Sequence, residues 1–194
     1  MYSKQAIQNV PDAKIIEIAE DLEIPVSSLA TTVRTPPANW KDTHRFRLFI
    51  SHISAEKLKA TRLKDCLEPY AISGFVAHED IHPTKQWQDE IERALYCMDA
   101  FVAIHTKGFS ASNWTQQEIG FAVGRGVKVI SLRMGEDPTG FISKQQALPR
   151  QRKTAEDVAR EIDQLLKNDP ITSNRVEAAK RAEGLLPGYD EIPF

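Results

Sequence analysis

The sequence predicts an α/β protein with a parallel sheet that carries helices on both faces. From Arg45 onward, short apolar runs alternate with longer segments in which apolar residues recur at helical spacing. The apolar runs are nearly continuous, which is typical of strands that are buried on both sides. Strands separated by helices in this way form parallel sheets with a helical layer on each face.

The segment before this pattern, residues 1–40, is predicted to be a helical N-terminal extension and linker. Asp12–Glu23 has helical periodicity, and Ser27 or Ser28 is suited to cap a second short helix. Thr35–Asn39 contains adjacent prolines, which is typical of an extended linker. We expect this extension either to recognise a partner or to cover part of the core.

Residues 41–150 are predicted to form the central domain, in which strands alternate with helices. The expected strands are Phe46–Ser51, Gly74–His78, Ala100–His105 and Val127–Leu132. The expected helices are Ser54–Tyr70, a segment with Trp87, Ile91, Ala94, Leu95 and Met98 on one face, and a segment that begins near Asn113. The last of these should end at Gly124 or Gly126, because glycine is favoured just past a helix end. Residues 135–146 are typical of a loop, with Phe141–Ile142 as a candidate short strand.

Residues 151–194 are predicted to add C-terminal helices that complete or extend this domain. Thr154–Lys167 is amphipathic, and Thr154 with Asp157 three residues later is suited to cap its first turn. Asn174–Leu185 is a second helical stretch that stops before Pro187.

Composition limits the class of protein further. A chain of 194 residues with 41% hydrophobic and 27% charged residues is long enough for one core with extensions. The formal net charge of −2 is nearly balanced, without the basic patch of a nucleic-acid-binding protein. Two cysteines, no signal peptide and no long apolar run favour a soluble, cytoplasmic protein that does not bind nucleic acid or membranes.

The segment from His105 to Glu118 is the strongest candidate for a functional site. The strand that ends at His105 leads into a polar, turn-rich loop, and the helix that follows places Trp114 and Glu118 on one face. Ligands of open α/β sheets bind just beyond the carboxyl ends of the strands. By spacing alone, an ordinary surface glutamate beside a half-buried tryptophan is the favoured interpretation.

Four motifs within Arg45–Ile142, about half of the chain, shift this balance because they resemble a TIR domain, the Toll/interleukin-1 receptor module. The first motif, Phe49-Ile-Ser-His52, is similar to the first box of the family, and Gly74-Phe-Val-Ala-His-Glu-Asp80 is similar to its second strand and the acidic start of the loop after that strand. The third, Glu90-Ile-Glu-Arg-Ala-Leu95, is similar to the helix that follows. The fourth, Phe109–Glu118, matches the Ser-x-Trp-x-x-x-Glu segment of the family. Their order and spacing identify the chain as similar to this family.

The resemblance implies a flavodoxin-like parallel sheet of five strands in the order 2-1-3-4-5, with helices on both faces. It also implies two kinds of function. Some TIR domains are scaffolds that assemble with other TIR domains. Others, common among bacterial and plant members, cleave NAD+ with the glutamate that corresponds to Glu118, and they generally work as assemblies.

The chemistry of NAD+ cleavage suits a single carboxylate. Nicotinamide in NAD+ is already a cationic leaving group, so the bond to ribose breaks without the general acid that ordinary glycosidases need. The positive charge that develops on the ribose requires stabilisation, which a carboxylate at position 118 supplies. We expect Glu118 at the margin of a buried stripe formed by Ile119, Ala122 and Val123, kept ionised by the helix dipole.

Four further residues are candidates for binding the substrate. Trp114 is expected either to stack on the nicotinamide or ribose or to pack against the loop. Ser51, His52 and Asp80, at strand ends, are candidates for hydrogen bonds to ribose or phosphate, although ordinary caps and turn contacts explain them nearly as well.

No cofactor is expected, because the glycines do not form a dinucleotide fingerprint between a strand and a helix, so NAD+ would be a substrate. No metal is expected either. His52, His78 and His105 follow or end three strands but lack the short spacing of metal ligands.

Two functions therefore compete. The first is an NAD+ glycohydrolase or cyclase that assembles as a homo-oligomer through TIR–TIR contacts. It would act in bacterial antiviral defence by abortive infection, or in stress signalling, with a downstream effector or sensor protein as a partner. The second is a non-catalytic TIR scaffold in which the loop Glu79–Lys85 recognises a partner. The pairing of Trp114 with Glu118 favours the enzyme, because a scaffold has no need of that acid.

Overall fold

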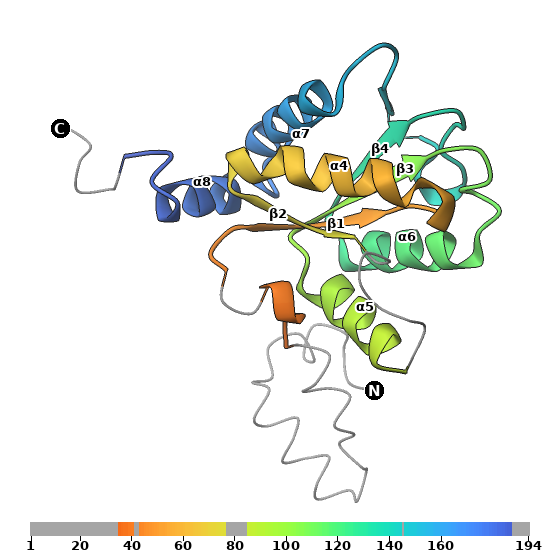
Figure 1. Cartoon of the computed structure of the whole chain (residues 1–194), viewed down its shortest axis with the longest axis horizontal. Coiled ribbons are helices and arrows are strands. Elements are labelled where there is room, and N and C mark those ends of the chain that lie inside the picture. The colour runs from red at the N-terminus through yellow and green to blue at the C-terminus, as the bar shows by residue number, and fades with distance from the viewer. Residues whose placement is uncertain (1–34, 41–42, 77–84, 145, 188–194) are drawn as a thin grey trace, which may run out of the picture.

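The computed structural model describes residues 35–40, 43–76, 85–144 and 146–187. Within these ranges five parallel strands form one sheet in the order β2-β1-β3-β4-β5, which confirms the predicted order (Figure 1). The strands are β1 Phe46–Ser51, β2 Ile72–Val76, β3 Ala100–His105, β4 Lys128–Arg133 and β5 Leu148–Pro149. The winding reverses between β1 and β3, which is the point where sheets of this kind bind ligands.

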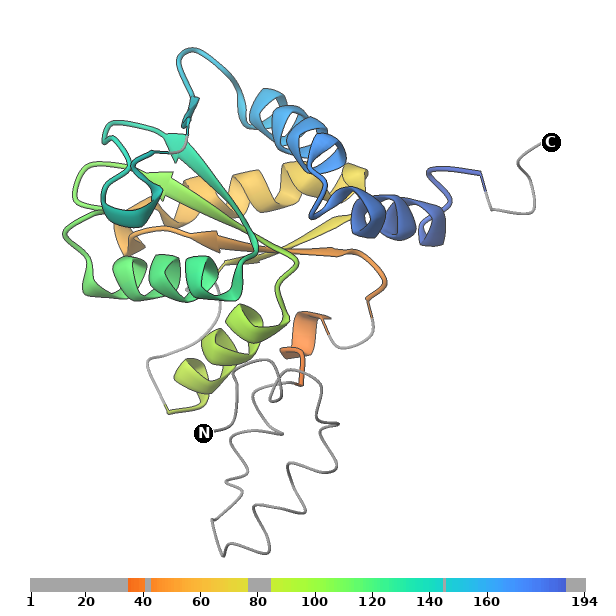
Figure 2. The ribbon, with the colours of Figure 1, turned by 180° about the vertical axis from the view of Figure 1, so that it is seen from behind.

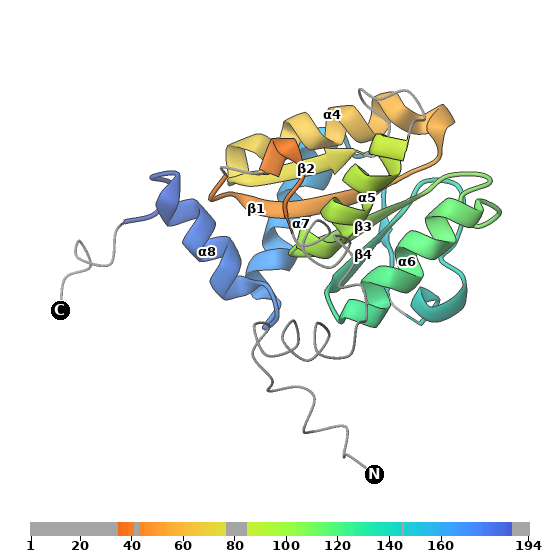
Figure 3. The same ribbon diagram turned by 90° about the horizontal axis from the view of Figure 1, so that it is seen from below.

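Helices cover both faces of the sheet. One face carries α4 Lys57–Leu67, α7 Ala155–Asn168 and α8 Ser173–Ala182. The other face carries α5 Lys85–Cys97 and α6 Asn113–Arg125. Figure 1 shows α4 and α7 above the sheet and α5 and α6 below it, Figure 2 shows the same layers from behind, and in Figure 3 α5 and α6 lie in front of the sheet.

Side chains along β1 point alternately to the two faces of the sheet, and this decides which of them can reach the candidate site. Phe46, Leu48 and Ile50 are buried among the residues of α4, α7 and α8, whereas Phe49 is buried among those of α5 and α6. Because side chains alternate across a strand, Ser51 points to the same face as Phe49. The last residue of β1 therefore faces α6.

Aromatic rings fill the centre of the α5/α6 face. Phe49 stacks on Phe101 and on Phe75, with ring centroids 5.5 Å apart in both pairs. Trp40 follows at 5.6 Å from Phe75 and is fully buried. Trp40 ends the short 3-10 helix η1 Ala38–Trp40, so the described end of the predicted N-terminal extension belongs to the core. Residues 1–34 of that extension lie outside the described residues.

Two predictions about short elements differ from the structure. The strand expected at Phe141–Ile142 is wrong, because these residues lie in the 3-10 helix η4 Gly140–Ile142. This helix begins at Gly140, which has a φ of 62° and whose carbonyl accepts a hydrogen bond from the hydroxyl of Ser143. The fifth strand is instead the two-residue β5, which pairs with the end of β4. So short a segment carries no periodicity that would reveal it.

The helix ends follow the expected local signals. Thr154 and Asp157 form the predicted capping box at the start of α7. Of the two candidate glycines, Gly126 ends α6, with φ of 69° and its N–H bonded to the carbonyl of Val123. β2 begins at Ile72, two residues earlier than predicted, because Ala71 at φ of 59° ends the preceding turn and the chain enters the strand at once.

Charged contacts attach α8 to the rest of the domain. Lys180 donates to Asp163 of α7 at 2.5 Å, and both side chains are buried. Arg175 donates to the carbonyls of His44 and Arg45 at 3.0 and 2.6 Å. The C-terminal helix is therefore an integral part of the described structure. None of the described helices has the length and apolar character needed to cross a membrane.

Candidate active site

The helix α6 begins at the carboxyl edge of the sheet, and a network of local hydrogen bonds fixes its first turn. The hydroxyl of Ser112 caps the helix by accepting the N–H of Thr115 at 3.4 Å. The hydroxyl of Thr115 donates to the carbonyl of Phe109 at 2.6 Å. Because this turn is fixed, the orientation of Glu118 one turn later is fixed as well.

Glu118 lies inside the protein, in contrast to the surface glutamate that spacing alone favours. Its side chain is 4% exposed and belongs to the buried face of α6 together with Thr115, Ile119 and Ala122. Val123, expected in this stripe, is instead exposed. Glu118 therefore lies within the buried face rather than at its margin.

Ser51 is the hydrogen-bond partner of this carboxylate. Its hydroxyl, fully buried at the end of β1, donates to Oε2 of Glu118 at 2.5 Å. The two residues are far apart in the chain, and the contact forms because β1 and α6 meet at the carboxyl edge of the sheet. Ser51, expected to contact ribose or phosphate, is bonded here to the acid itself.

Burial changes the ionisation of Glu118. Removal of the carboxyl from water raises its pKa to about 7, and the hydrogen bond from Ser51 acts in the opposite direction because it stabilises the charged form. The helix dipole was expected to keep the acid ionised. Glu118 lies beyond the first turn of α6, where the dipole has little effect, and burial has the larger influence. At neutral pH both protonation states are populated.

A pocket of about 290 Å³ lies between α5 and α6, and Glu118 forms part of its wall. The other lining residues are Gln88, Ile91, Glu92, Leu95, Tyr96, Trp114, Gln117 and Phe121. Trp114 lies at the edge of the pocket and is 43% exposed. The rings of Tyr96 and Phe121 meet edge to face, with their centroids 4.8 Å apart. A buried acid thus borders an open hollow lined by aromatic rings, as in many sites for planar ligands.

The structure brings some of the predicted site residues together and leaves others apart. Trp114 and Glu118 line the same pocket, and Ser51 bonds to Glu118. His52 is buried with Nδ1 3.3 Å from the carbonyl oxygen of Ile50, and it is not among the described residues that line the pocket. Asp80 lies outside the described residues.

The sequence did not predict that residues of α5 form one wall of the pocket. Ile91 and Leu95 were recognised only as a buried stripe, while Glu92 and Tyr96 lie on the exposed side of that stripe and line the pocket rim. The sequence carries the helical spacing of α5 but no signal for its packing beside α6, which depends on the tertiary fold.

A buried histidine lies on the same face of the sheet. His105, at the end of β3, has Nε2 3.3 Å from the hydroxyl of Ser131 and its ring 4.6 Å from that of Phe109. Burial lowers the pKa of this imidazole, which favours its neutral form. Among the described residues no group of three histidine, cysteine or acidic side chains is arranged to hold a metal, and His78 lies outside them.

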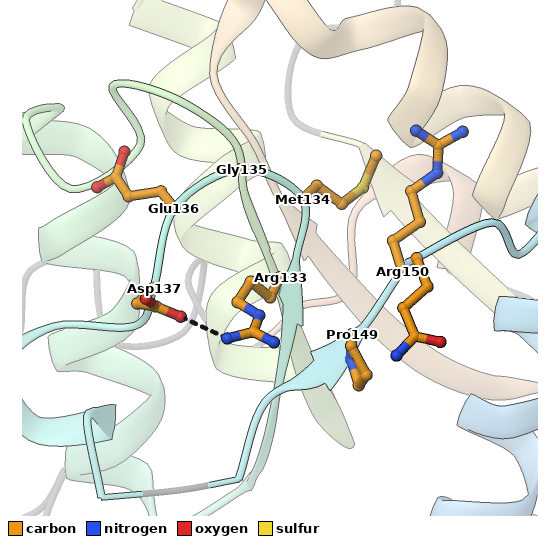
Figure 4. Close-up of a pocket in the computed structure, with 8 residues that line it drawn as sticks. Arg133, Met134, Gly135, Glu136, Asp137, Pro149 and Arg150 are labelled. Carbon is orange, nitrogen blue, oxygen red and sulfur yellow. Dashed lines mark hydrogen bonds and ion pairs between the residues drawn. The ribbon is translucent and has the colours of Figure 1, made fainter.

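A second hollow of about 420 Å³ opens beside the ends of β4 and β5 (Figure 4). Arg133 and Asp137 form an ion pair at its edge, at 3.0 Å. Glu136 accepts the N–H groups of Gly108 and Ser110 at 2.7 and 2.9 Å, and the hydrogen bonds with Ser110 are the largest influence that lowers its pKa. This carboxylate therefore holds the loop that leads into α6.

The fold and this site define the chain as a flavodoxin-like α/β domain with a buried acid at the carboxyl edge of its sheet. Residues 48–168 match the family model described as the TIR domain. The match spans more than half of the chain, and the protein belongs to the TIR domain family. The matched range includes α7, which the sequence placed in the C-terminal segment, and ends before α8.

Comparison with solved structures agrees with this family. The chain is similar to the TIR domain of the Toll-related receptor TRR-2 from the lower metazoan Hydra magnipapillata, with a TM-score of 0.53 and 13% sequence identity. The similarity covers 63% of this chain and 99% of that chain. At this identity it supports the fold alone. The comparison with curated proteins gave no match.

Proposed function

We propose that the protein cleaves the bond between nicotinamide and ribose in NAD+, with Glu118 as the catalytic residue. The observation that carries this proposal is the position of Glu118, 4% exposed and yet part of the wall of an open pocket that it shares with Trp114. Burying an acid is costly, and interaction between domains gives no reason for that cost at this position. Perturbed carboxylates in pockets are typical of catalytic sites.

The carboxylate would act on the ribose. As the bond to nicotinamide breaks, its electron pair moves to the pyridinium ring, which leaves as neutral nicotinamide, and positive charge develops on the sugar. Ionised Glu118 stabilises that charge. In hydrolysis a water oxygen bonds to the ribose carbon and its proton passes to the carboxylate, whose pKa of about 7 suits it to accept one at neutral pH. In cyclisation a nucleophile within the ADP-ribose part replaces the water.

The cationic nicotinamide ring of the substrate would also change the ionisation of Glu118. A positive charge within a few ångströms favours the ionised carboxylate and lowers its pKa. NAD+ therefore converts the protonated part of the population into the active form as it binds. Ser51 is a positioning residue in this scheme, because its hydroxyl fixes one carboxylate oxygen. Trp114 supplies an exposed indole on which nicotinamide stacks.

The active form is proposed to be a homo-oligomer. The pocket of about 290 Å³ lies at the small end of the range for ligand sites, and it holds only part of a dinucleotide. TIR domains commonly interact through TIR–TIR contacts, and a neighbouring copy would supply the remaining walls. Consumption of NAD+ by such an assembly in the cytoplasm suits antiviral defence by abortive infection or stress signalling, with a sensor or effector protein as a further partner.

The second candidate is a signalling scaffold that assembles through TIR–TIR contacts without catalysis. Membership of the TIR domain family favours it, because TIR domains commonly interact through TIR–TIR contacts. In this case Glu118 has no role beyond structure, and its replacement by glutamine leaves the function intact.

Release of nicotinamide distinguishes the two. The full chain is incubated with NAD+ over a range of protein concentrations, with a crowding agent to promote assembly, and the products are analysed by mass spectrometry. We expect release that rises more steeply than the protein concentration, and a loss of at least about a hundredfold in Glu118→Gln. Glu177→Gln, an exposed acid on α8, is the matched control and should keep full activity. Equal release from Glu118→Gln and the wild type would contradict the proposal.

A further inference from the structure

A third hollow lies on the opposite face of the sheet from Glu118, between α4 and α7. Its volume is about 200 Å³. The lining residues are Leu58, Lys59, Arg62, Leu63, Ile104, Leu132, Met134, Arg150, Thr154, Ala155 and Val158. It opens at the carboxyl ends of β3 and β4, and it shares no lining residue with the pocket that contains Glu118.

The interior of this α4/α7 pocket is apolar. Leu63, Ile104 and Val158 form its buried part, and Leu58 extends the apolar surface outward, with 85% of its side chain exposed. A cavity of about 150 Å³ lined by aliphatic and aromatic side chains stays dry and accepts benzene. A pocket of this size and lining therefore takes a ring or a short alkyl chain.

The rim of the pocket is positively charged. Two of its three cations are already neutralised, since Lys59 pairs with Glu56 and Arg62 pairs with Glu156. Within the part of the chain that the structure describes, no carboxylate pairs with the guanidinium of Arg150.

The backbone around Arg150 is held by two hydrogen bonds, and its exposed side chain lines both this hollow and the one beside β4 and β5. Its N–H bonds to the carbonyl of Arg133 at 3.1 Å, and its carbonyl accepts the N–H of Lys153 at 2.9 Å. Figure 4 shows its side chain extending away from the ion pair of Arg133 and Asp137, on the same side as Met134. The end of β5 therefore anchors the backbone from which this cation extends.

The start of α7 adds to this positive potential. Thr154 and Ala155 at its N-terminus line the pocket, so the positive end of the helix dipole lies at the rim. The acids of the first turn do not cancel Arg150, because Glu156 pairs with Arg62 and Asp157 pairs with Arg160. An apolar interior thus adjoins one available cation.

We propose that the α4/α7 pocket binds a small amphipathic anion, a free monocarboxylate with a ring or short alkyl chain as its apolar body. The apolar body occupies the space between Leu63 and Val158, and the carboxylate pairs with Arg150. This site is independent of NAD+ cleavage, since it lies on the other face of the sheet and uses other residues.

Hexanoate is the probe that tests this site, with hexanol and acetate as controls. The full chain is titrated with each in amide NMR experiments. We expect hexanoate to shift the signals of residues around Leu58 and Val158. Hexanoate should bind at least about tenfold more tightly than acetate, since each buried methylene strengthens binding by about fourfold. Equal effects of hexanoate and acetate would overturn the proposal.

Two variants distinguish the contribution of the Arg150 charge to binding from that of the apolar cavity. Arg150→Gln should weaken hexanoate about fivefold and leave hexanol unchanged, as expected for a partly exposed charge pair. Ala155→Leu should fill the hollow and weaken both. The matched control is Arg152→Gln, an exposed arginine outside the pocket, which should bind like the wild type. Unchanged hexanoate binding in both Arg150→Gln and Ala155→Leu would overturn the site.

A second copy of the chain is the competing occupant. Sedimentation of the wild type and of Ala155→Leu over a range of concentrations tests it. If Ala155→Leu changes self-association while hexanoate produces no shifts in the wild type, the pocket receives a neighbouring chain and the proposal is wrong. Unchanged self-association together with hexanoate shifts supports it.

Discussion

Replacement of Glu118 by glutamine should remove a pH-dependent loss of stability that the wild-type chain carries. Burial raises the pKa of this carboxyl from 4.5 to about 7 in the folded protein, while the unfolded chain keeps the ordinary value. The folded state therefore holds its proton at a pH where the unfolded state has released it. The resulting stability is fully present below pH 4.5 and is lost as the pH rises to about 7.

The size of the effect follows from the two pKa values. A tenfold change in proton affinity is worth about 1.4 kcal/mol, so a rise from 4.5 to about 7 corresponds to about 3 kcal/mol. Glu118 is almost completely buried, which leaves little screening by solvent. Glutamine has the same shape and accepts the hydrogen bond of Ser51 but does not ionise.

Urea unfolding of the two proteins at about pH 4 and about pH 8 measures this. Any constant difference between glutamate and glutamine cancels when the two pH values are compared. At each pH the free energy of unfolding of the wild type is subtracted from that of Glu118→Gln. We expect this difference to be about 3 kcal/mol larger at the higher pH than at the lower. A difference that does not change with pH would refute the argument that burial controls this carboxyl.

Three further predictions concern neighbouring residues. Ser51→Ala removes a hydrogen bond that favours the charged carboxylate, so the pKa of Glu118 should rise further and the acidic limb of the pH profile of nicotinamide release should move to higher pH. Trp114→Ala should lower kcat/KM for NAD+ by about tenfold through lost stacking, with a change in unfolding free energy under about 1 kcal/mol because the indole is half exposed. Asp163→Ala should cost about 3 to 5 kcal/mol in urea unfolding, because it leaves the buried ammonium of Lys180 without this carboxylate.

Each of these has a result that contradicts it. An unmoved pH profile in Ser51→Ala would mean that its hydroxyl does not influence the acid. Full kcat/KM in Trp114→Ala would assign the indole to packing against the loop. A loss below about 1 kcal/mol in Asp163→Ala would show that Lys180 finds another partner or reaches water.

The fold could be predicted where local signals agree. β3 and α6 have the predicted starts, because a continuous apolar run defines the strand and Asn113 follows a capping serine. β5 could not be predicted, because two residues that include a proline carry no pattern. The strand order came from the resemblance to a known family, since periodicity alone does not say which strands are neighbours.

The candidate site could be predicted only in part. The spacing of Trp114 and Glu118 placed them on one helix face, and both line one pocket. The burial of Glu118 and its bond to Ser51 depend on how β1 meets α6, which is a tertiary contact between distant segments. The sequence predicted the opposing influences of desolvation and the helix dipole on Glu118 but not their balance, because the extent of burial depends on the same tertiary contact.

The protonation of Glu118 with and without a cationic ligand tests the central claim most directly. Carbon NMR of the chain with labelled glutamate carboxyls, assigned by comparison with Glu118→Gln, reports its pKa. 1-Methylnicotinamide serves as a cation that is not cleaved, and neutral nicotinamide is the control. We expect a pKa of about 7 in the free protein and a lower pKa when 1-methylnicotinamide is bound, with a smaller change for nicotinamide. An ordinary pKa in the free protein, or one that the bound cation leaves unchanged, would contradict the account.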